Sequence, residues 1–142
     1  MFYLDSSVVV SAVSAETATD LVLNWLSAHK DVLTSDWLMT EAVAALSQKR
    51  RMGVLAAEEH AQALAALHRQ IGGTFSWVPV TPQNFRLAAR FAERAETRLR
   101  AGDALHLAIV SAADATLVTL DRGQARAGEL LQLKTILLRL DS

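Results

Sequence analysis

Short apolar stretches alternate with longer amphipathic segments along this chain, and this alternation limits the folds open to it more than any other feature. The short stretches have the length and composition of buried strands, whereas the longer segments repeat apolar residues at helical spacing. The expected strands span residues 2–4, 32–34, 77–80, 116–120 and 135–138. The expected helices span residues 6–13, 17–28, 37–51, 56–71, 82 to about 97, 103–113 and 122–131.

Strands that are separated by helices predict a parallel sheet, because parallel pairing needs a crossover connection and a helix supplies it. The fold class is therefore α/β, with a mostly parallel, short-stranded sheet and helices on both faces. In such sheets the ligand crevice lies beyond the carboxyl ends of the strands. The helix over residues 103–113 is apolar on nearly every side, so we expect it to be buried.

Capping and breaking residues predict where several helices begin and end. Asp36 is the expected N-cap of the third helix, and Gly53 follows its basic last turn. Gly72 and Gly73 are expected to end the fourth helix, and Pro82 suits the first turn of the fifth.

The bulk composition excludes several classes of protein. A chain of 142 residues that is 51% hydrophobic predicts a single domain over residues 1–142. With no Cys, it has no disulfide, zinc-thiolate site or thiol nucleophile, so any metal must be held by oxygen or imidazole. The formal charge of -1 argues against a general polyanion binder. No basic leader and no apolar run of ~20 residues is present, so we expect a cytoplasmic protein with no membrane partner.

Four acids are predicted to meet at one edge of the sheet. Asp5 and Asp121 end strands, Glu41 lies in the opening turns of the third helix, and Asp103 starts the buried helix. Four carboxylates brought together repel one another, so the cluster is expected either to hold protons or to bind a hard cation such as Mg²⁺ or Mn²⁺. A cation on carboxylates can activate water for attack on phosphorus, which makes phosphodiester hydrolysis the natural chemistry.

Each acid also has a simpler interpretation when it is taken alone. Asp5 after a strand is as readily the N-cap of the next helix, and Asp103 suits the positive end of a helix dipole. Glu41 alone reads as a solvated helix residue, and Asp121 alone reads as a turn residue. Asp103 alone already favours a function, because it borders a segment too apolar to tolerate a charge without a reason. Glu41 and Asp121 favour one only as part of the set of four acids.

The segments that carry these acids resemble the acidic motifs of PIN-domain nucleases. These segments are "MFYLDSSVVV", "TEAVAAL", "RAGDALHLAIV" and "LVTLDRG", and the likeness is greatest to VapC-type toxins of bacterial toxin-antitoxin pairs. The resemblance implies a PIN-like three-layer fold and a magnesium- or manganese-dependent endoribonuclease. It also implies a homodimer that is inhibited by a cognate antitoxin protein.

The resemblance further assigns roles to individual residues. It makes Asp5, Glu41, Asp103 and Asp121 the catalytic set, with Asp5, Asp103 and Asp121 as metal ligands. Ser7 would be a supporting polar residue, and we place Thr119 in the same role. Taken alone, Ser7 is better explained as a helix cap, and strand propensity explains Thr119 as well. Family members often have an acidic or aromatic residue soon after the fourth acid. Here the sequence continues with Arg122, Gly123, Gln124 and Ala125 instead.

Arginines recur near the third acid and form a candidate RNA contact. Arg86, Arg90, Arg94 and Arg98 are spaced every four residues, which on one helix would align them as a ridge leading to Arg100. The simpler interpretation is a solvated stripe paired with nearby glutamates.

The histidines and tryptophans carry weaker signals. His29, His60, His68 and His106 show no metal-ligand spacing, and His106, one turn after Asp103, is expected to pack or bond within its helix. The tryptophans are expected in the core or at a subunit interface, although Trp37, near Glu41, is placed to stack on RNA bases.

Three other functions remain open from the sequence. The chain could be a PIN-like RNA-processing nuclease outside a toxin pair, or an idle module that only docks a partner. A magnesium-binding phosphoacceptor domain is less favoured, because Ser6 stands where a second acid would follow Asp5 and Lys134 precedes the last strand.

Overall fold

The computed structural model describes residues 1–140, and its five short strands form one parallel sheet in the order β3-β2-β1-β4-β5. The strands are β1 (Phe2–Leu4), β2 (Val32–Thr34), β3 (Ser76–Trp77), β4 (Thr116–Thr119) and β5 (Thr135–Leu137). The helices are α1 (Ser6–Val13), α2 (Thr19–Ala28), α3 (Asp36–Arg51), α4 (Ala57–Thr74), α5 (Pro82–Glu93), α6 (Ala101–Ala112) and α7 (Arg122–Leu130), and η1 (Ala95–Thr97) is a 3-10 turn.

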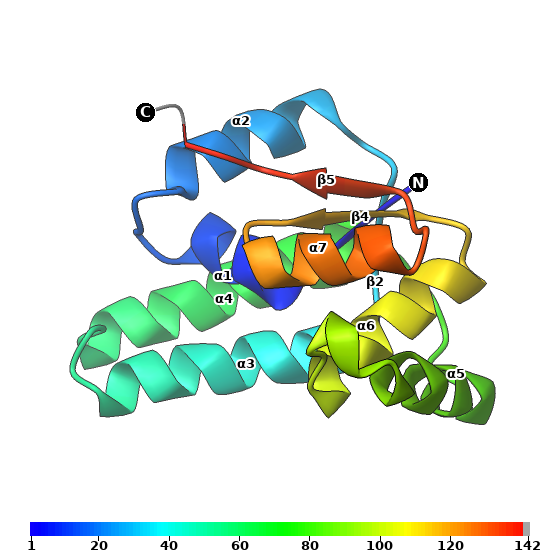
Figure 1. Ribbon diagram of the computed structural model, residues 1–142. Coiled ribbons are helices and arrows are strands. Elements are labelled where there is room, and N and C mark those ends of the chain that lie inside the picture. Colours follow the sequence, from blue (N-terminus) through cyan, green and yellow to red (C-terminus); the bar gives the residue numbers. More distant parts are fainter. Residues whose placement is uncertain (141–142) are drawn as a thin grey trace.

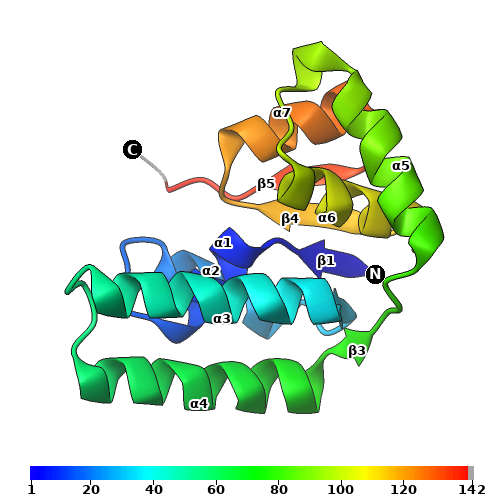
Figure 2. The same ribbon diagram turned by 90° about the horizontal axis from the view of Figure 1, so that it is seen from below.

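Helices cover both faces of the sheet, which confirms the predicted three-layer α/β fold. Figure 1 shows α2 above the strands, and the α3–α4 hairpin with α5 below them. Figure 2 shows α3 and α4 side by side, while α5 and α6 lie together at the other end of the molecule. α7 packs against β4 and β5.

The core is centred on β1 and α6. Tyr3 and Leu4 of β1 are completely buried, and β1 pairs with β2 on one side and β4 on the other. Every residue of α6 from 104 to 110 is buried, as the apolar sequence predicts. The one strongly polar side chain in that stretch is His106, and such a group needs hydrogen-bond partners.

The strand order places a ligand crevice between β1 and β4. Chain order runs outward from β1 to β3 in one direction, and from β4 to β5 in the other, so the direction of winding reverses between β1 and β4. In open α/β sheets ligands bind at such a reversal, beyond the carboxyl ends of the strands. Asp5 follows β1 and Asp121 follows β4 shortly after its end, so both acids lie at this point.

Several predicted helix boundaries are wrong. Ser35, and not Asp36, caps α3, because its hydroxyl accepts a hydrogen bond from the Leu38 amide at 3.1 Å. α4 runs through Gly72 and Gly73 to Thr74, since neither glycine leaves the negative-φ region. α5 ends at Glu93, four residues before the predicted end.

The third and fourth strands are shorter than predicted. β3 spans only Ser76–Trp77, and β4 ends at Thr119. Within residues 1–140, no helix has both the length and the apolar character needed to cross a membrane.

Candidate active site

Asp5 lies at the base of the site, between β1 and α1. Its side chain is only 5% exposed, and its Oδ1 caps α1 by accepting from the Val8 amide at 3.3 Å. Ser7 donates to the same oxygen at 2.5 Å, and Thr119 donates to Oδ2. Burial raises the pKa of Asp5, and the hydrogen bonds from Ser7 and Thr119 offset part of that effect.

Ser7 and Thr119 connect Asp5 to the opposite side of the crevice. The Ser7 hydroxyl accepts from the Leu120 amide at 3.3 Å, and the Thr119 hydroxyl accepts from the Asp121 amide at 2.9 Å. The two hydroxyls therefore fix the end of β4 against Asp5. The sequence-based choice of both as supporting residues agrees with this arrangement.

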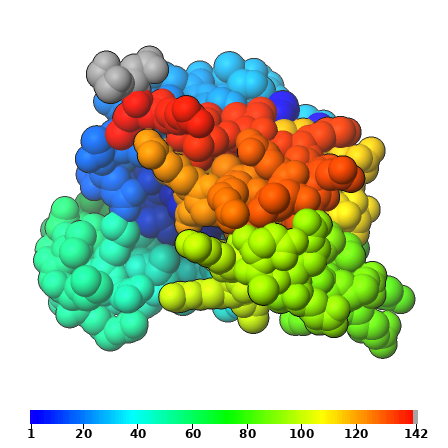
Figure 3. Space-filling view, in the orientation of Figure 1, coloured from blue at the N-terminus to red at the C-terminus, as the bar shows by residue number. Residues whose placement is uncertain are grey.

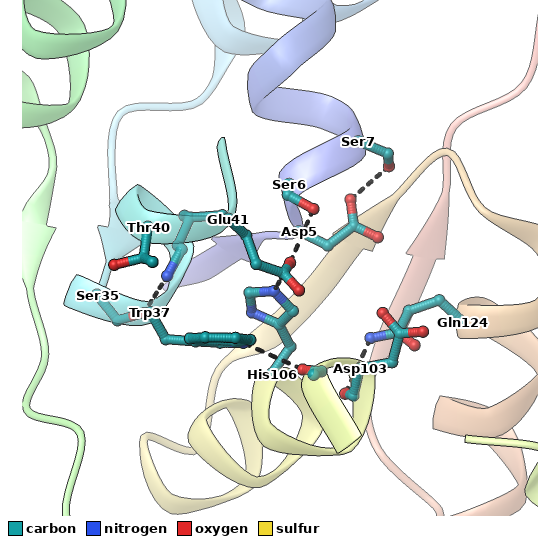
Figure 4. A network of polar contacts seen from close by, with 12 residues as sticks. Asp5, Ser6, Ser7, Ser35, Trp37, Thr40, Glu41, Asp103, His106 and Gln124 are labelled. Atoms are coloured by element: carbon teal, nitrogen blue, oxygen red, sulfur yellow. Dashed lines mark hydrogen bonds and ion pairs between the residues drawn. The ribbon is translucent and has the colours of Figure 1, made fainter. Parts of the chain in front are cut away.

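Glu41 reaches the site from α3 and is held by two donors. Its Oε1 accepts from Ser6 at 3.0 Å and lies 2.6 Å from Nε2 of His106 (Figure 4). Burial alone would raise the pKa of Glu41, but the hydrogen bond and charge of His106, with the bond from Ser6, lower it overall. Glu41 is therefore held in its ionised form. Both hydrogen bonds go to Oε1, and Oε2 takes part in neither.

His106 continues this network into the core. Its side chain is 1% exposed, and its Nδ1 lies 2.9 Å from the Tyr3 hydroxyl, which lies 2.8 Å from the Ser35 hydroxyl. With the proton on Nε2, the ring donates to Glu41 and accepts from Tyr3, while Tyr3 accepts from Ser35. Every polar group in the network is then satisfied. The expectation that His106 bonds within its own helix is wrong, because its partners lie on α3 and β1.

Gly102 allows Glu41 to approach the start of α6. A Cβ atom at this position would stand 2.8 Å from Oε2 of Glu41 and 3.1 Å from Cζ2 of Trp37. The Trp37 indole donates to the Gly102 carbonyl at 3.1 Å, so α3 and α6 are locked together here. Trp37 thus has a structural contact beside the site.

Asp103 lies in the first turn of α6, among the other acids. Its pKa is raised by burial first and then by the charges of Glu41, Asp121 and Asp5, while His106 lowers it in part. No hydrogen bond contributes to this balance. The carboxylate of Asp103 is therefore repelled by the three other acids without a hydrogen bond to offset the repulsion.

Asp121 is exposed at the rim and caps α7. Its Oδ1 accepts from the amides of Gly123 at 2.7 Å and Gln124 at 3.1 Å. The side chain of Gln124 lies underneath and donates to the Asp103 carbonyl at 3.2 Å. The simpler interpretation of Asp5 as a helix cap is thus true. Asp121, expected to be a turn residue when taken alone, is also a helix cap. The charges of both acids act on Asp103.

The side chains suit a hard cation in type, although the predicted three-ligand set is not assembled. Among residues 1–140, no three His, Asp or Glu side chains form a group that could hold a metal ion. Like charges repel, and protein donors already occupy oxygens of Asp5 and Asp121. Mg²⁺ is commonly held by one or two carboxylates and several waters, so Asp103 with one neighbouring acid fits that cation.

The predicted arginine ridge does not exist as one helix face. Arg86 and Arg90 lie on α5, but Arg94 follows its last residue and bonds to Glu96 and to the Leu130 carbonyl. Arg98 follows η1 with a φ of +56°. After Glu93 the spacing of four residues no longer places side chains on one helix face. Of the five predicted RNA-contact arginines, Arg98 and Arg100 line a pocket together with Asp103.

A hollow on the surface leads toward the acids. Figure 3 shows it between α3, in cyan, and the yellow-green segment around residues 95–100, with dark-blue residues near the start of α1 at its floor. Sequence reasoning missed His106 and Gln124 as parts of this site. The signal for His106 was its place in the apolar face of α6, where a lone polar residue needs a partner.

The chain belongs to the PIN domain family, whose sequence profile matches residues 2–130. No curated protein sequence matches it significantly.

Solved structures show the same fold at low sequence identity. VapC20 of Mycobacterium tuberculosis, described as a Sarcin-Ricin loop cleaving toxin, is 20% identical with a TM-score of 0.72, over 90% of this chain and 95% of that one. FitAcB from Neisseria gonorrhoeae is 18% identical with a TM-score of 0.68, over 96% of each chain. VapBC2 from Rickettsia felis, solved with a promoter DNA fragment, is 15% identical with a TM-score of 0.69, over 98% of this chain and 100% of that one.

Proposed function

We propose that this protein is a metal-dependent endoribonuclease that hydrolyses RNA phosphodiester bonds. The observation that carries the proposal is the position of Asp103, whose pKa is raised by burial and by three other acids that all come from the carboxyl edge of the sheet. A cluster of this kind gains most from a divalent cation. Membership of the PIN domain family and the likeness to VapC20 support the same chemistry.

The acids would divide the work between binding and water activation. Asp103, with one neighbouring acid, would hold Mg²⁺ or Mn²⁺, which when bound would lower the pKa of water and offset charge on the phosphate. Ser7 and Thr119 orient the Asp5 carboxylate. Glu41, kept ionised by His106 and Ser6, has Oε2 available to accept a proton from the attacking water.

The strand order argues against the phosphoacceptor alternative. Response regulators of the CheY kind have the order 2-1-3-4-5, whereas β1 here lies between β2 and β4. The acids of this protein therefore meet at a different reversal point of the sheet.

RNA cleavage with matched variants tests the activity. The protein is incubated with total cellular RNA in Mg²⁺, in Mn²⁺ and in chelator, and the cut ends are mapped. Discrete metal-dependent cuts are expected, and Asp5→Asn and Asp103→Asn should abolish them. Asp114→Asn is the control, because Asp114 is 90% exposed just after α6 and loses the same charge. No cutting by folded wild type would overturn the proposal.

We infer that the cellular role is that of a toxin restrained by an antitoxin encoded beside it. The likeness to VapC20, FitAcB and VapBC2 supports this role, and we expect a cytoplasmic homodimer. Induced expression alone should stop growth, and expression with the neighbouring reading frame should restore it. Normal growth under induction would favour the second candidate, an RNA-processing nuclease outside a toxin pair. Light scattering on the purified protein tests the dimer.

A further inference from the structure

A pocket of about 370 Å³ opens beside the acids, between η1, the start of α6 and α7. Asp103 and Asp121 are among the residues that line it. Three arginines also line it: Arg98, Arg100 and Arg126. Its volume falls at the small end of ligand pockets, so it suits one nucleotide and excludes a duplex.

Two of these arginines are brought to the pocket by the turn that ends the α5 region. The chain leaves η1 through Arg98 in the left-handed conformation, at a φ of +56°, and enters α6 after Arg100. Arg126 comes from α7 and donates from Nη1 to the Glu96 carbonyl at 2.9 Å, which ties α7 to η1. In Figure 3 the yellow-green residues near position 95–100 lie directly beside the orange surface of α7.

The pocket is lined by both acids and arginines, a combination that suits one part of an RNA strand. Arginine forks match phosphate geometry, whereas bare carboxylates repel phosphate unless a cation lies between them. A strand crossing the pocket could therefore place one phosphate at the acids and the adjoining phosphate at the arginines. A free anion would contact the arginines alone and would make no use of the acids.

Gln124 gives a second, independent indication of a ligand. Its side chain is 4% exposed in the pocket wall, and Nε2 donates to the Asp103 carbonyl, but Oε1 has no partner among the described residues. A buried acceptor without a donor is unfavourable and calls for a partner that the protein does not supply. Because Gln124 is one of the residues that line the pocket, a nucleotide bound there could supply the missing donor.

We propose that this pocket binds the nucleotide adjoining the scissile phosphate, with Arg98, Arg100 and Arg126 as phosphate ligands and Gln124 Oε1 as the acceptor for a donor on that nucleotide. The inference rests on the proposed nuclease function and deepens it. It adds Arg126 and Gln124 as specificity-determining residues, and the donor is either a base amino group or the ribose 2′-hydroxyl.

Salt dependence tests the phosphate contact. For a short single-stranded RNA, Arg126→Gln should raise KM roughly tenfold, as expected for loss of one charge-assisted contact, and leave kcat close to wild type. The slope of log(kcat/KM) against log salt should fall by about 0.7. Arg126→Lys keeps the positive charge, so its salt slope should equal that of wild type. If Arg126 acted only through its hydrogen bond to the Glu96 carbonyl, the salt slope would not follow the charge at position 126. Arg69→Gln, exposed on α4, is the control.

Cleavage of a randomised RNA library tests Gln124. Gln124→Met removes the acceptor, whereas Gln124→Glu keeps an acceptor oxygen and should behave as wild type at a lower rate. If a base amino group is the donor, Gln124→Met should flatten the base preference beside the cut. If the ribose 2′-hydroxyl is the donor, a 2′-deoxy nucleotide at that position should lower kcat/KM of wild type but have no further effect in Gln124→Met.

The two possible failures can be told apart. Absence of metal-dependent cutting by wild type overturns the nuclease and this pocket with it. Cutting by wild type overturns the pocket alone if the salt slope is unchanged in Arg126→Gln and if Gln124→Met changes neither the base preference nor the effect of the 2′-deoxy nucleotide. RNA binding followed by fluorescence anisotropy in Ca²⁺ gives a check that needs no turnover: Arg126→Gln should bind more weakly than Arg69→Gln.

Discussion

Nε2 of His106 lies 2.6 Å from Oε1 of Glu41, which joins the buried helix α6 to the acidic residue that α3 contributes to the candidate site. On its other side His106 meets the Tyr3 hydroxyl at 2.9 Å, and burial raises the pKa of Tyr3 so that this hydroxyl keeps its proton. The orientation of Glu41 thus depends on a hydrogen-bond chain that starts inside the core.

Replacing His106 by Phe should weaken both the fold and the activity. The change leaves Glu41 without its strongest partner, so the free energy of unfolding should fall by about 1–3 kcal/mol in urea titrations. Adding Glu41→Gln should cost less than the sum of the two single changes, because the residues share one interaction. His68→Phe on the exposed face of α4 is the control. Full additivity would show that the contact does not matter to stability.

Thr119→Val and Thr34→Val form a matched pair of predictions. Both threonines are completely buried at the end of a strand, but Thr119 donates to Asp5, whereas the Thr34 hydroxyl has no partner within residues 1–140. Thr119→Val should lower the free energy of unfolding by about 1–3 kcal/mol, because a buried carboxyl oxygen of Asp5 loses its hydrogen-bond donor. Thr34→Val should be neutral or stabilising. Equal losses in thermal or urea unfolding would contradict the role assigned to Thr119.

Asp103→Asn should stabilise the protein at pH 7 in chelator. The folded pKa of Asp103 is raised, so its ionised form opposes folding above that pKa, and the opposition disappears below the unfolded pKa of about 3.9. The gain from the variant should therefore be present at pH 7 and absent near pH 3, as measured by urea unfolding.

Adding Mg²⁺ should reverse the order of the two proteins. A cation bound to the native state stabilises wild type by about 2.7 kcal/mol at a hundred times its Kd, and Asp103→Asn should gain much less. If Mg²⁺ raises the Tm of both proteins equally, Asp103 is not a ligand.

Gly102→Ala should reduce RNA cleavage without unfolding the protein. The added methyl group would meet Oε2 of Glu41 at 2.8 Å and push it away from the site, so kcat is expected to fall by at least roughly tenfold. Gly72→Ala is the control, because a Cβ there meets nothing within 4 Å, and it should stabilise α4 by about 0.5–1 kcal/mol. Wild-type activity in Gly102→Ala would mean that the position of Glu41 is not critical.

The sequence predicts the acids of the site well because strand ends fix their positions. Asp5 and Asp121 each follow an apolar strand, and in a parallel sheet such ends meet at one edge whatever the details of packing. Glu41 and Asp103 follow from the helices that begin there. The α/β class follows from the same alternation of strands and helices.

The remaining features depend on contacts between distant segments. His106 finds Tyr3 more than a hundred positions away, and the sequence carries no sign of that pairing. The arginine spacing was misread because α5 stops at Glu93, where neither a glycine nor a proline marks the end. The predicted stop at Gly72 failed because packing of α4 against α3 outweighs the weak helix propensity of glycine.

The pairing of β1 with β4 joins residues 2–4 to residues 116–118, and the acids on either side of this pair lie at positions 5 and 121. During synthesis the first acid leaves the ribosome early but has no partner across the crevice until β4 has emerged. On the proposed function, a nascent chain would therefore lack its assembled acids until β4 has emerged and paired with β1. That delay would leave time for the proposed antitoxin to be made before cleavage could begin.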